Sequence, residues 1–289
     1  MNFTGRVGFL MRLACRLSHS FKPAPGLPKK PLHALQLFGV AYADMLLDAL
    51  SGKGWLTPRQ VRSICDFGSG TGGPVLAMLA FFGLPAHKLT LLEAHESQAA
   101  RLRELFPKSR VMAGNGLLWL GSCRKRYDLI TAFMLGPDED AGLALSLVRR
   151  ALPRLNQTGR LLICTDTATM HGLRRVLGQV PGISCQWLVD EPNLPLTVLV
   201  SKFGGKERQS DNLGGVNLPE PIIRSAEIAD AHGNLETEHY CLATPFEKNY
   251  LCATIEAFEA EAPSHPGIAQ MKRLLDCSAG KNSGADDSK

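Results

Sequence analysis

The chain lacks the cysteine patterns that mark metal sites. Its eight cysteines are scattered over 289 residues, no two are spaced as Cys-x-x-Cys, and no cysteine–histidine cluster has zinc-finger spacing. We therefore expect no metal site. Cys65 and Cys164 lie inside apolar runs, where a free thiol packs as a small hydrophobe. This usage predicts an intracellular, reducing location, either the cytoplasm or the mitochondrial matrix.

A long apolar run and a strong excess of charge are also missing. The longest strongly apolar run, residues 75–84, is shorter than the ~20 residues that cross a bilayer, so we expect no transmembrane segment. The formal net charge is +5. This mild excess permits contact with nucleic acid but does not argue for it alone.

Acidic residues are absent from the first 43 positions. Arg6, Arg12 and Arg16 are interleaved there with apolar residues at helical spacing. The pattern suits an organelle targeting peptide, which is rich in Arg and poor in acid. It suits equally a basic amphipathic helix that lies on the protein or on RNA. We therefore treat residues 1–34 as a basic N-terminal segment, which ends in a proline-rich connector.

The body of the chain alternates short apolar strands with helical stretches. A helix is expected over residues 35–50, and further helices over 74–82, 97–105 and 170–178. Such alternation is typical of a parallel sheet that is covered by helices on both faces and binds ligands at the carboxyl ends of its strands. The expected strands are residues 63–67, 89–92, 110–113, 128–134 and 160–165.

Two further strands, residues 185–189 and 196–202, are joined by a connection too short for a crossover helix, so they should be antiparallel. A glycine-containing polar stretch at 204–218 is typical of a linker. A hairpin (222–229 and 237–243) and a helix (250–260) then form a small extension over 219–262. From residue 263 on we expect a mostly flexible tail.

A glycine loop follows the first strand of the body. The run from Asp66 to Gly73 lies between a strand and a helix, where glycines permit a tight turn and the close approach of a ligand. Glu93 ends the next strand, ~20 residues or slightly more beyond the loop, where an acid typically binds a ribose. Together the loop and the acid indicate a cofactor that contains adenosine.

The glycines alone fit two families, since they satisfy both Gly-x-Gly-x-x-Gly and Asp-x-Gly-x-Gly-x-Gly. Asp66 favours the second pattern, because a carboxylate there would repel a pyrophosphate but would attract the amino group of methionine. The chain also contains no Tyr-x-x-x-Lys of a short-chain dehydrogenase.

Over residues 35–203 the chain resembles the class I S-adenosylmethionine-dependent methyltransferases. The resemblance implies an α/β fold with a Rossmann-like seven-stranded sheet, its last strand antiparallel, to which this chain adds the small C-terminal β-hairpin extension. S-adenosylmethionine would lie across the carboxyl edge of the sheet, with its ribose held by Glu93. Its methionine part would be held by the loop residues Asp66, Gly68, Ser69, Gly70 and Gly72.

The resemblance also assigns residues to the adenine. Ala94 and His95 would flank the ring, although His95 equally suits an exposed loop. Asn115 stands where the family commonly has an Asp that accepts from the adenine amino group, and an Asn carbonyl can accept the same hydrogen bond. Trp119 either covers the ring or packs in the core.

The catalytic residues stay unassigned. Phe133 and the segment through Gly136 line the place where the acceptor would meet the methyl group, and this segment has neither the Asn/Asp-Pro-Pro-Tyr of amino-methylating enzymes nor a cysteine. Methyl transfer depends mostly on positioning, so a missing base does not exclude it. The acids at 138–140 suit a solvated helix start better than a site for a cationic substrate.

A narrower resemblance is to the methyltransferase-like assembly factors of the mitochondrial small ribosomal subunit. It rests on residues 127–136, on 165–176 and on the appended hairpin, and it implies RNA or a ribosomal subunit as the partner. The cysteine cluster that those factors carry is missing here. The leading prediction is a methyltransferase whose acceptor is unresolved and for which RNA is favoured. A non-catalytic RNA-binding or ribosome-assembly factor and an NAD(P)-dependent oxidoreductase are the alternatives.

Overall fold

The structure, a computed structural model, describes residues 34–136, 141–202, 218–229, 235–261, 263–265 and 267–279. The expected basic N-terminal segment lies outside these residues except for its last position. So do nearly all of the expected linker, the acidic residues at 138–140 and the last ten residues of the expected tail.

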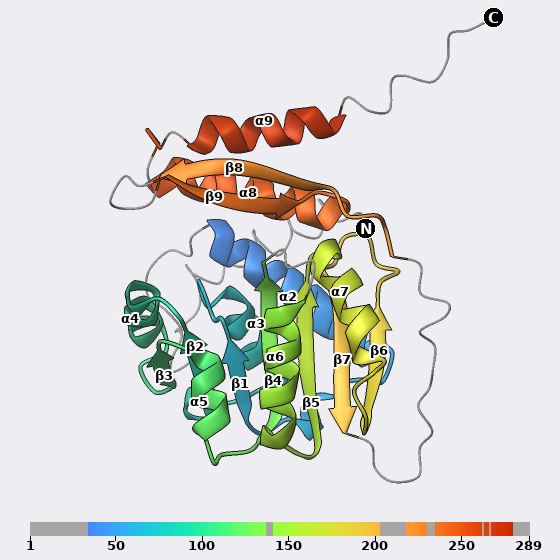
Figure 1. Cartoon of the computed structure of the whole chain (residues 1–289). Helices are drawn as coiled ribbons and strands as arrows, with labels where there is room; N and C mark the ends of the chain where they lie inside the picture. The colour runs from blue at the N-terminus through green and yellow to red at the C-terminus, as the bar shows by residue number, and fades with distance from the viewer. Residues whose placement is uncertain are drawn as a thin grey trace, which may run out of the picture.

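Seven strands form one mixed sheet in the order β3-β2-β1-β4-β5-β7-β6 (Figure 1). The first five strands along the chain are parallel, whereas β7 runs antiparallel to both of its neighbours, β5 and β6. The expected seven-stranded α/β sheet with an antiparallel last strand is thereby confirmed. The strands are β1 (Ile64–Phe67), β2 (Leu89–Glu93), β3 (Arg110–Ala113), β4 (Tyr127–Leu135), β5 (Leu155–Thr165), β6 (Ile183–Leu188) and β7 (Leu196–Lys202).

Helices cover both faces of this sheet. Buried side chains of α2 and α3 form one core with one face, while those of α6 and α7, with Leu120 of α5, form a second core with the other. Figure 1 shows α5, α6 and α7 in front of the sheet, with α2 and α3 behind it. The helices are α2 (Ala34–Gly52), α3 (Gly73–Phe82), α4 (Glu96–Leu105), α5 (Gly116–Ser122), α6 (Gly142–Ala151) and α7 (Thr167–Leu177).

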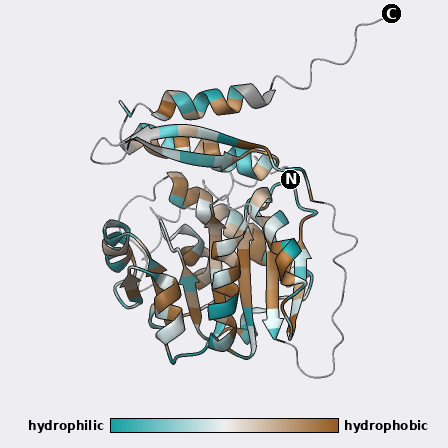
Figure 2. Cartoon of the chain, in the orientation of Figure 1, coloured by the Kyte–Doolittle hydropathy of each residue, from teal (hydrophilic) through white to brown (hydrophobic). Residues whose placement is uncertain are grey.

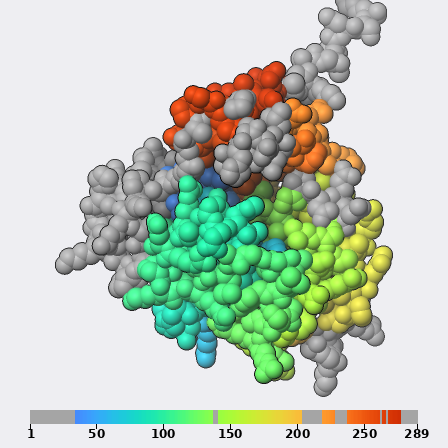
Figure 3. Space-filling view, turned by 60° about the vertical axis from the view of Figure 1, so that its left-hand side comes forward, coloured from blue at the N-terminus to red at the C-terminus, as the bar shows by residue number. Residues whose placement is uncertain are grey.

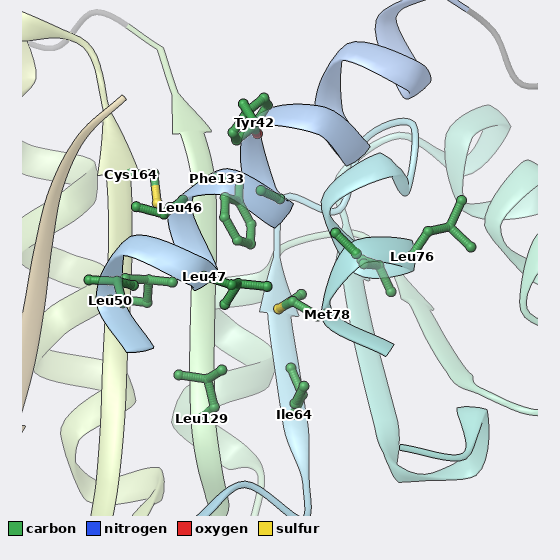
Figure 4. Close-up of a cluster of buried hydrophobic side chains, with 14 of the residues drawn as sticks. Tyr42, Leu46, Leu47, Leu50, Ile64, Leu76, Met78, Leu129, Phe133 and Cys164 are labelled. Atoms are coloured by element: carbon green, nitrogen blue, oxygen red, sulfur yellow. The ribbon is translucent and has the colours of Figure 1, made fainter. Parts of the chain in front are cut away.

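The core is built from the apolar positions that the sequence pattern selects. The strands appear as brown, apolar bands in Figure 2. Because a parallel sheet is buried on both faces, its strands are apolar along their whole length rather than at alternate positions. Figure 4 shows Leu46, Leu47 and Leu50 of α2 packed against Leu129 of β4 and Met78 of α3.

By length and composition α2 passes the test for a membrane-spanning helix, with a mean hydropathy of 1.2. Polar residues such as Asp44 and Asp48 interrupt its apolar sequence, so no long uninterrupted apolar run marks this helix in the sequence. Nine residues of α2 are buried within the protein, and they include Phe38, Tyr42 and Leu46. The apolar side chains of this helix are thus largely packed in the core that it forms with the seven-stranded sheet, which together with its covering helices we call the sheet domain.

A small C-terminal unit follows the sheet domain. Strands β8 (Ile223–Ala229) and β9 (Leu235–Cys241) form the expected antiparallel hairpin, which packs with α8 (Pro245–Glu261). A further helix, α9 (Gly267–Ala279), occupies part of the expected flexible tail. Ile268 and Met271 of α9 are buried against Leu251 and Ile255 of α8, so this helix is stabilised by packing that composition alone does not reveal.

Candidate functional site

The loop between β1 and α3 is shaped by three glycines at the carboxyl edge of the sheet. Gly68, Gly70 and Gly72 have φ angles of 70°, 48° and 75°, in the left-handed region that glycine adopts without a steric penalty. The backbone N–H groups of Gly68 and Ser69 donate to the carbonyl oxygen of Leu92, at 2.8 and 3.1 Å. The loop is therefore tied to the carboxyl end of the neighbouring strand, β2.

Two of the loop glycines face open space and one does not. A Cβ atom added to Gly68 would meet no atom within 4 Å, and one added to Gly70 would meet only a backbone oxygen at 3.9 Å. A Cβ on Gly72 would lie 2.9 Å from the ring of Phe106 and 3.0 Å from Leu102. The absence of a side chain at Gly72 thus lets Leu102 of α4 and the following Phe106 pack against the loop. Gly68 and Gly70, in contrast, leave backbone exposed to a ligand.

Two more glycines leave the same edge of the sheet open. Gly114 follows β3 and Gly136 follows β4, both are exposed, and a Cβ on either would meet nothing within 4 Å. With Gly68 after β1, the carboxyl ends of three parallel strands carry glycines with free space in front of them. Ligands of open α/β sheets bind at this position.

Glu93 points toward the glycine loop. Its side chain is buried, and its Oε2 atom accepts a hydrogen bond from the N–H of Gly70 at 2.8 Å, while Oε1 accepts from the N–H of His95 at 3.1 Å. A carboxylate has about four acceptor positions, so about two remain for a ligand. Ala94 and His95 follow on the exposed start of α4.

Asp66 lies beneath the loop rather than beside it. Its side chain is 2% exposed, and Oδ1 accepts from the hydroxyl of Thr131 on β4 at 2.5 Å. The Ser69 hydroxyl donates to the backbone oxygen of Asp66 at 3.3 Å. Burial raises the pKa of the Asp66 carboxyl to about 7, although hydrogen bonds from Thr131 and Ser69 oppose this shift.

Asn115 is the N-cap of α5. Its Oδ1 atom accepts from the N–H of Leu118 at 3.0 Å, which satisfies one of the free donors at the helix start. The cap uses one lone pair of this oxygen, so the predicted contact with adenine would use the other. Trp119, one turn into the same helix, is partly buried and packs against the core. The Cζ atom of Arg110 lies over its ring, 5.5 Å from the ring centroid.

Phe133 is 7% exposed and belongs to an aromatic cluster above the sheet. Its ring centroid lies 6.1 Å from that of Tyr42 on α2, which in turn lies 5.3 Å from Phe246 on α8. Phe38 extends the cluster, 5.6 Å from Phe246. Helices α2 and α8, which are far apart in sequence, therefore both cover the carboxyl end of β4.

The chain bends sharply at the end of β4. Met134 has a φ of 53°, and the pairing with β5 shifts register between Phe133 and Leu135. The hydroxyl of Thr165 donates to the carbonyl oxygen of Leu135 at 2.9 Å, and that of Thr169 lies 3.0 Å from the carbonyl oxygen of Gly136. Such strain at a sheet edge persists only when surrounding bonds enforce it, as they do here.

Sequence reasoning missed two contributors to this edge. The Nε2 atom of Gln36 donates to the backbone oxygen of Thr71 at 2.7 Å and so ties α2 to the glycine loop. An isolated polar residue in an apolar helix was the available signal. Glu247 is the second contributor, and its signal was the Thr-x-x-Glu spacing of a capping box with Thr244.

The acceptor atoms of Glu93 and the open backbone at Gly68 and Gly70 suit the binding and positioning of a ligand. Within the described ranges no group of three or more His, Cys, Asp or Glu residues has an arrangement that would hold a metal ion. His171, on the nearby helix α7, is engaged with the carbonyl oxygen of Pro219 at 2.9 Å.

Comparisons with known proteins find similarity in structure only. No protein-family model and no curated protein matches the chain. The solved structures that are similar include TrmN from Thermus thermophilus, at 21% identity over 55% of this chain and 49% of that one, with a TM-score of 0.40. A putative O-methyltransferase from Klebsiella pneumoniae matches at 18% identity over 68% of this chain and 89% of that one, with a TM-score of 0.42.

A putative methylase from Haemophilus influenzae matches at 15% identity over 56% of this chain and 99% of that one, with a TM-score of 0.43. This chain therefore covers about half of the Thermus protein (49%) and nearly all of the Haemophilus protein (99%). These are similarities of fold, and they assign neither an activity nor a substrate to this chain.

Proposed function

We propose that this chain is an S-adenosylmethionine-dependent methyltransferase. The observation that carries the proposal is the contact between Glu93 and Gly70, which places a buried carboxylate beside an open, glycine-lined backbone at the carboxyl edge of the sheet. A ribose with two neighbouring hydroxyl groups would suit the remaining acceptor positions of Glu93.

The residues present fit the other parts of this cofactor. The exposed backbone at Gly68 and Gly70 would admit the methionine part, and the carboxyl of Asp66 lies below it with a polarity suited to an ammonium group. The free lone pair of Asn115 Oδ1 would accept from the adenine amino group. When bound, the cofactor would supply a methyl group on a sulfonium, and the protein would hold the acceptor in line with it.

The sheet order argues against the NAD(P)-dependent alternative. Dinucleotide-binding folds have the order 3-2-1-4-5-6 with parallel strands. Here the antiparallel β7 lies between β5 and β6, and a buried carboxylate, that of Asp66, lies under the loop that would have to accept a pyrophosphate.

A second candidate is a non-catalytic factor that keeps the pocket and binds RNA or a ribosomal subunit. The aromatic cluster favours this candidate, since Phe133, Tyr42 and Phe246 occupy the region above β4 where an acceptor would approach. RNA remains the favoured acceptor or partner in both readings. For both we propose a reducing location, the cytoplasm or the mitochondrial matrix, which would keep thiols such as those of Cys65 and Cys164 free.

Calorimetry tests the proposal by measuring the binding of S-adenosylmethionine and of NADP. A tritiated-methyl transfer screen over RNA, protein and metabolite pools then tests for activity.

Glu93→Ala and Gly70→Val should each abolish binding of S-adenosylmethionine while the protein stays folded. Glu96→Ala is the matched control, since Glu96 is exposed and three positions away. Unchanged titrations for both pocket variants would refute the site. Binding without methyl transfer would favour the non-catalytic factor.

A further inference from the structure

A cluster of basic side chains lies at the amino edge of the sheet, opposite the candidate cofactor site. We call it the amino-edge basic patch. It draws on the connection between α5 and β4, the last turn of α6, the 3₁₀ turn before β5 and the end of β7. Its members are Arg124, Lys125, Arg126, Arg149, Arg150, Arg154 and Lys202.

Several contacts bring these segments together. Arg154 donates to the carbonyl oxygens of Leu120 and Gly121, at 2.9 and 2.8 Å, and so ties the turn before β5 to the end of α5. Arg150 reaches the same helix end, since its Nη1 atom lies 3.0 Å from the position of a Cβ on Gly121. In Figure 3 green surface reaches the lower end of the view, away from the orange and red C-terminal unit.

Lys202 joins the patch from β7. Its Nζ atom donates to the carbonyl oxygen of Leu155 at 2.8 Å. Burial lowers the pKa of Lys202, and the positive charge of nearby Arg126 lowers it further. Repulsion between like charges at this edge is therefore present in the folded chain.

The basic side chains of the patch outnumber the acids near them in the described ranges. The only acid in the described ranges 116–136 and 141–165 on the amino side of the sheet is Asp128. Its oxygens accept from the N–H of Arg62, the hydroxyl of Ser63 and the amide of Asn156. Ion pairs between described residues join Glu96 to Arg103 and Glu259 to Lys272, and both lie outside the patch.

The composition of the patch favours phosphate groups over a lipid surface. Five of its seven members are arginines, whose planar guanidinium binds phosphate with two parallel hydrogen bonds. An interfacial membrane site would add exposed apolar side chains. The exposed large apolar residues in the described chain are Leu118, Leu143 and Ile222, and none of them lies in these connections.

We infer that the amino-edge basic patch binds the phosphodiester backbone of a nucleic acid. The glycine loop follows Phe67, which pairs with Ala132 in the middle of β4, so about 20 Å of strand separate the loop from the patch at the start of β4. The patch is therefore a second binding surface and not part of the cofactor pocket. The inference deepens the RNA-directed function proposed above, yet it requires neither the cofactor nor catalysis.

Fluorescence anisotropy on the full chain tests the inference. It measures the affinity for a labelled 20-nucleotide single-stranded RNA and for a DNA of the same sequence at several KCl concentrations. The variant Arg124→Gln/Arg126→Gln/Arg149→Gln removes three exposed charges from the patch. The logarithm of the binding constant falls linearly with the logarithm of the salt concentration, and each phosphate contact contributes about 0.7 to the steepness of this line. We therefore expect the variant to reduce the steepness by about 2 and to lower the affinity about tenfold or more near 100 mM salt. The RNA and DNA arms identify which nucleic acid binds more tightly.

The control variant Arg224→Gln/Lys272→Gln/Arg273→Gln removes the same charge from the C-terminal unit, and its affinity should stay within about twofold of wild type. Replacement of the three patch arginines by lysine should preserve most of the salt slope. If the glutamine variant does not fold, Arg124→Gln alone should still lower the slope by about 0.7.

Equal losses in the patch and control variants would overturn the inference, because they would reflect net charge alone. So would binding to phosphatidylserine vesicles or polyglutamate with no binding to either nucleic acid. Calorimetry with S-adenosylmethionine on the patch variant keeps the two proposals separate. Unchanged cofactor binding with lost nucleic-acid binding supports the patch, and the reverse pattern contradicts it.

Discussion

Glu247, in the first turn of α8, accepts hydrogen bonds from both the backbone N–H and the hydroxyl of Thr167, each at 2.7 Å, although the two residues lie 80 positions apart. Its other oxygen accepts from the N–H of Thr244 at 2.8 Å. One buried carboxylate thus caps α7 of the sheet domain and α8 of the C-terminal unit at once. This link holds α8 over the edge where the chain after β4 bends.

Removal of that carboxylate should destabilise the whole chain. We expect Glu247→Ala to lower the free energy of unfolding by about 3 kcal/mol, because three buried donors lose their acceptor, and Glu247→Gln to lower it by about 1 kcal/mol. Urea denaturation measures both. Glu256→Ala, an exposed change on the same helix, should stay within about 0.5 kcal/mol of wild type. A loss for Glu247→Ala no larger than for this control would show that the link does not stabilise the fold.

The raised pKa of Asp66 makes stability depend on pH. Between the ordinary value of 3.8 and about 7 the folded chain holds a proton that the unfolded chain has released, so the free energy of unfolding falls as pH rises through this window. The slope from this group is at most about 1.4 kcal/mol per pH unit. Asp66→Asn keeps an acceptor for Thr131 but does not titrate, and its unfolding profile from pH 5 to 8 should be flatter than that of wild type. Parallel profiles would contradict the assignment.

The same carboxyl should release a proton when a cation binds near it. If the ammonium group of S-adenosylmethionine lies close to Asp66, it favours the charged form, so affinity should rise with pH up to about 7. Calorimetry at pH 6.5 in two buffers of different ionisation enthalpy measures the protons released. A heat that is the same in both buffers would place the ammonium group elsewhere.

Two glycines in helices should respond oppositely to the same substitution. A Cβ on Gly73 would lie 2.3 Å from the carbonyl oxygen of Gln36, whereas one on Gly52 would meet nothing within 4 Å. We expect Gly73→Ala to cost about 3 kcal/mol of stability through overpacking. Gly52→Ala should be neutral or stabilise by up to about 1 kcal/mol. Thermal and urea unfolding of the pair would show whether α2 and α3 approach as closely as described.

Gln36 should affect the cofactor without touching it. Its hydrogen bond to Thr71 steadies the glycine loop, so Gln36→Leu should weaken binding of S-adenosylmethionine about tenfold, which corresponds to the loss of one part-buried hydrogen bond. Gln179→Leu, a like change at an exposed position, serves as the control. Equal affinities for Gln36→Leu and wild type would show that α2 does not steady the loop.

Most strands were predictable because their signals are local. The bounds of β3 and β7 agree with the sequence prediction, since turn residues flank each short apolar run. No residue range was predicted for α5 or α6, although a helix start was expected at the acids 138–140, just before α6. The first spans only seven residues and contains two glycines, so its local signal is weak. The second buries residues 144, 147, 148 and 151 at helical spacing, a signal that the sequence prediction did not use. Their formation depends on the sheet face that they cover.

The sequence by itself determined the α/β class, the antiparallel last strand and the loop with its acid, because each follows from short-range constraints on backbone angles and connection length. Only the tertiary structure decided that Gly72 makes room for packing while Gly70 faces Glu93. It also decided that Glu247 joins two helices and that scattered arginines meet at one edge of the sheet. Contacts between segments far apart in sequence depend on how the whole core packs, and no local pattern encodes that packing.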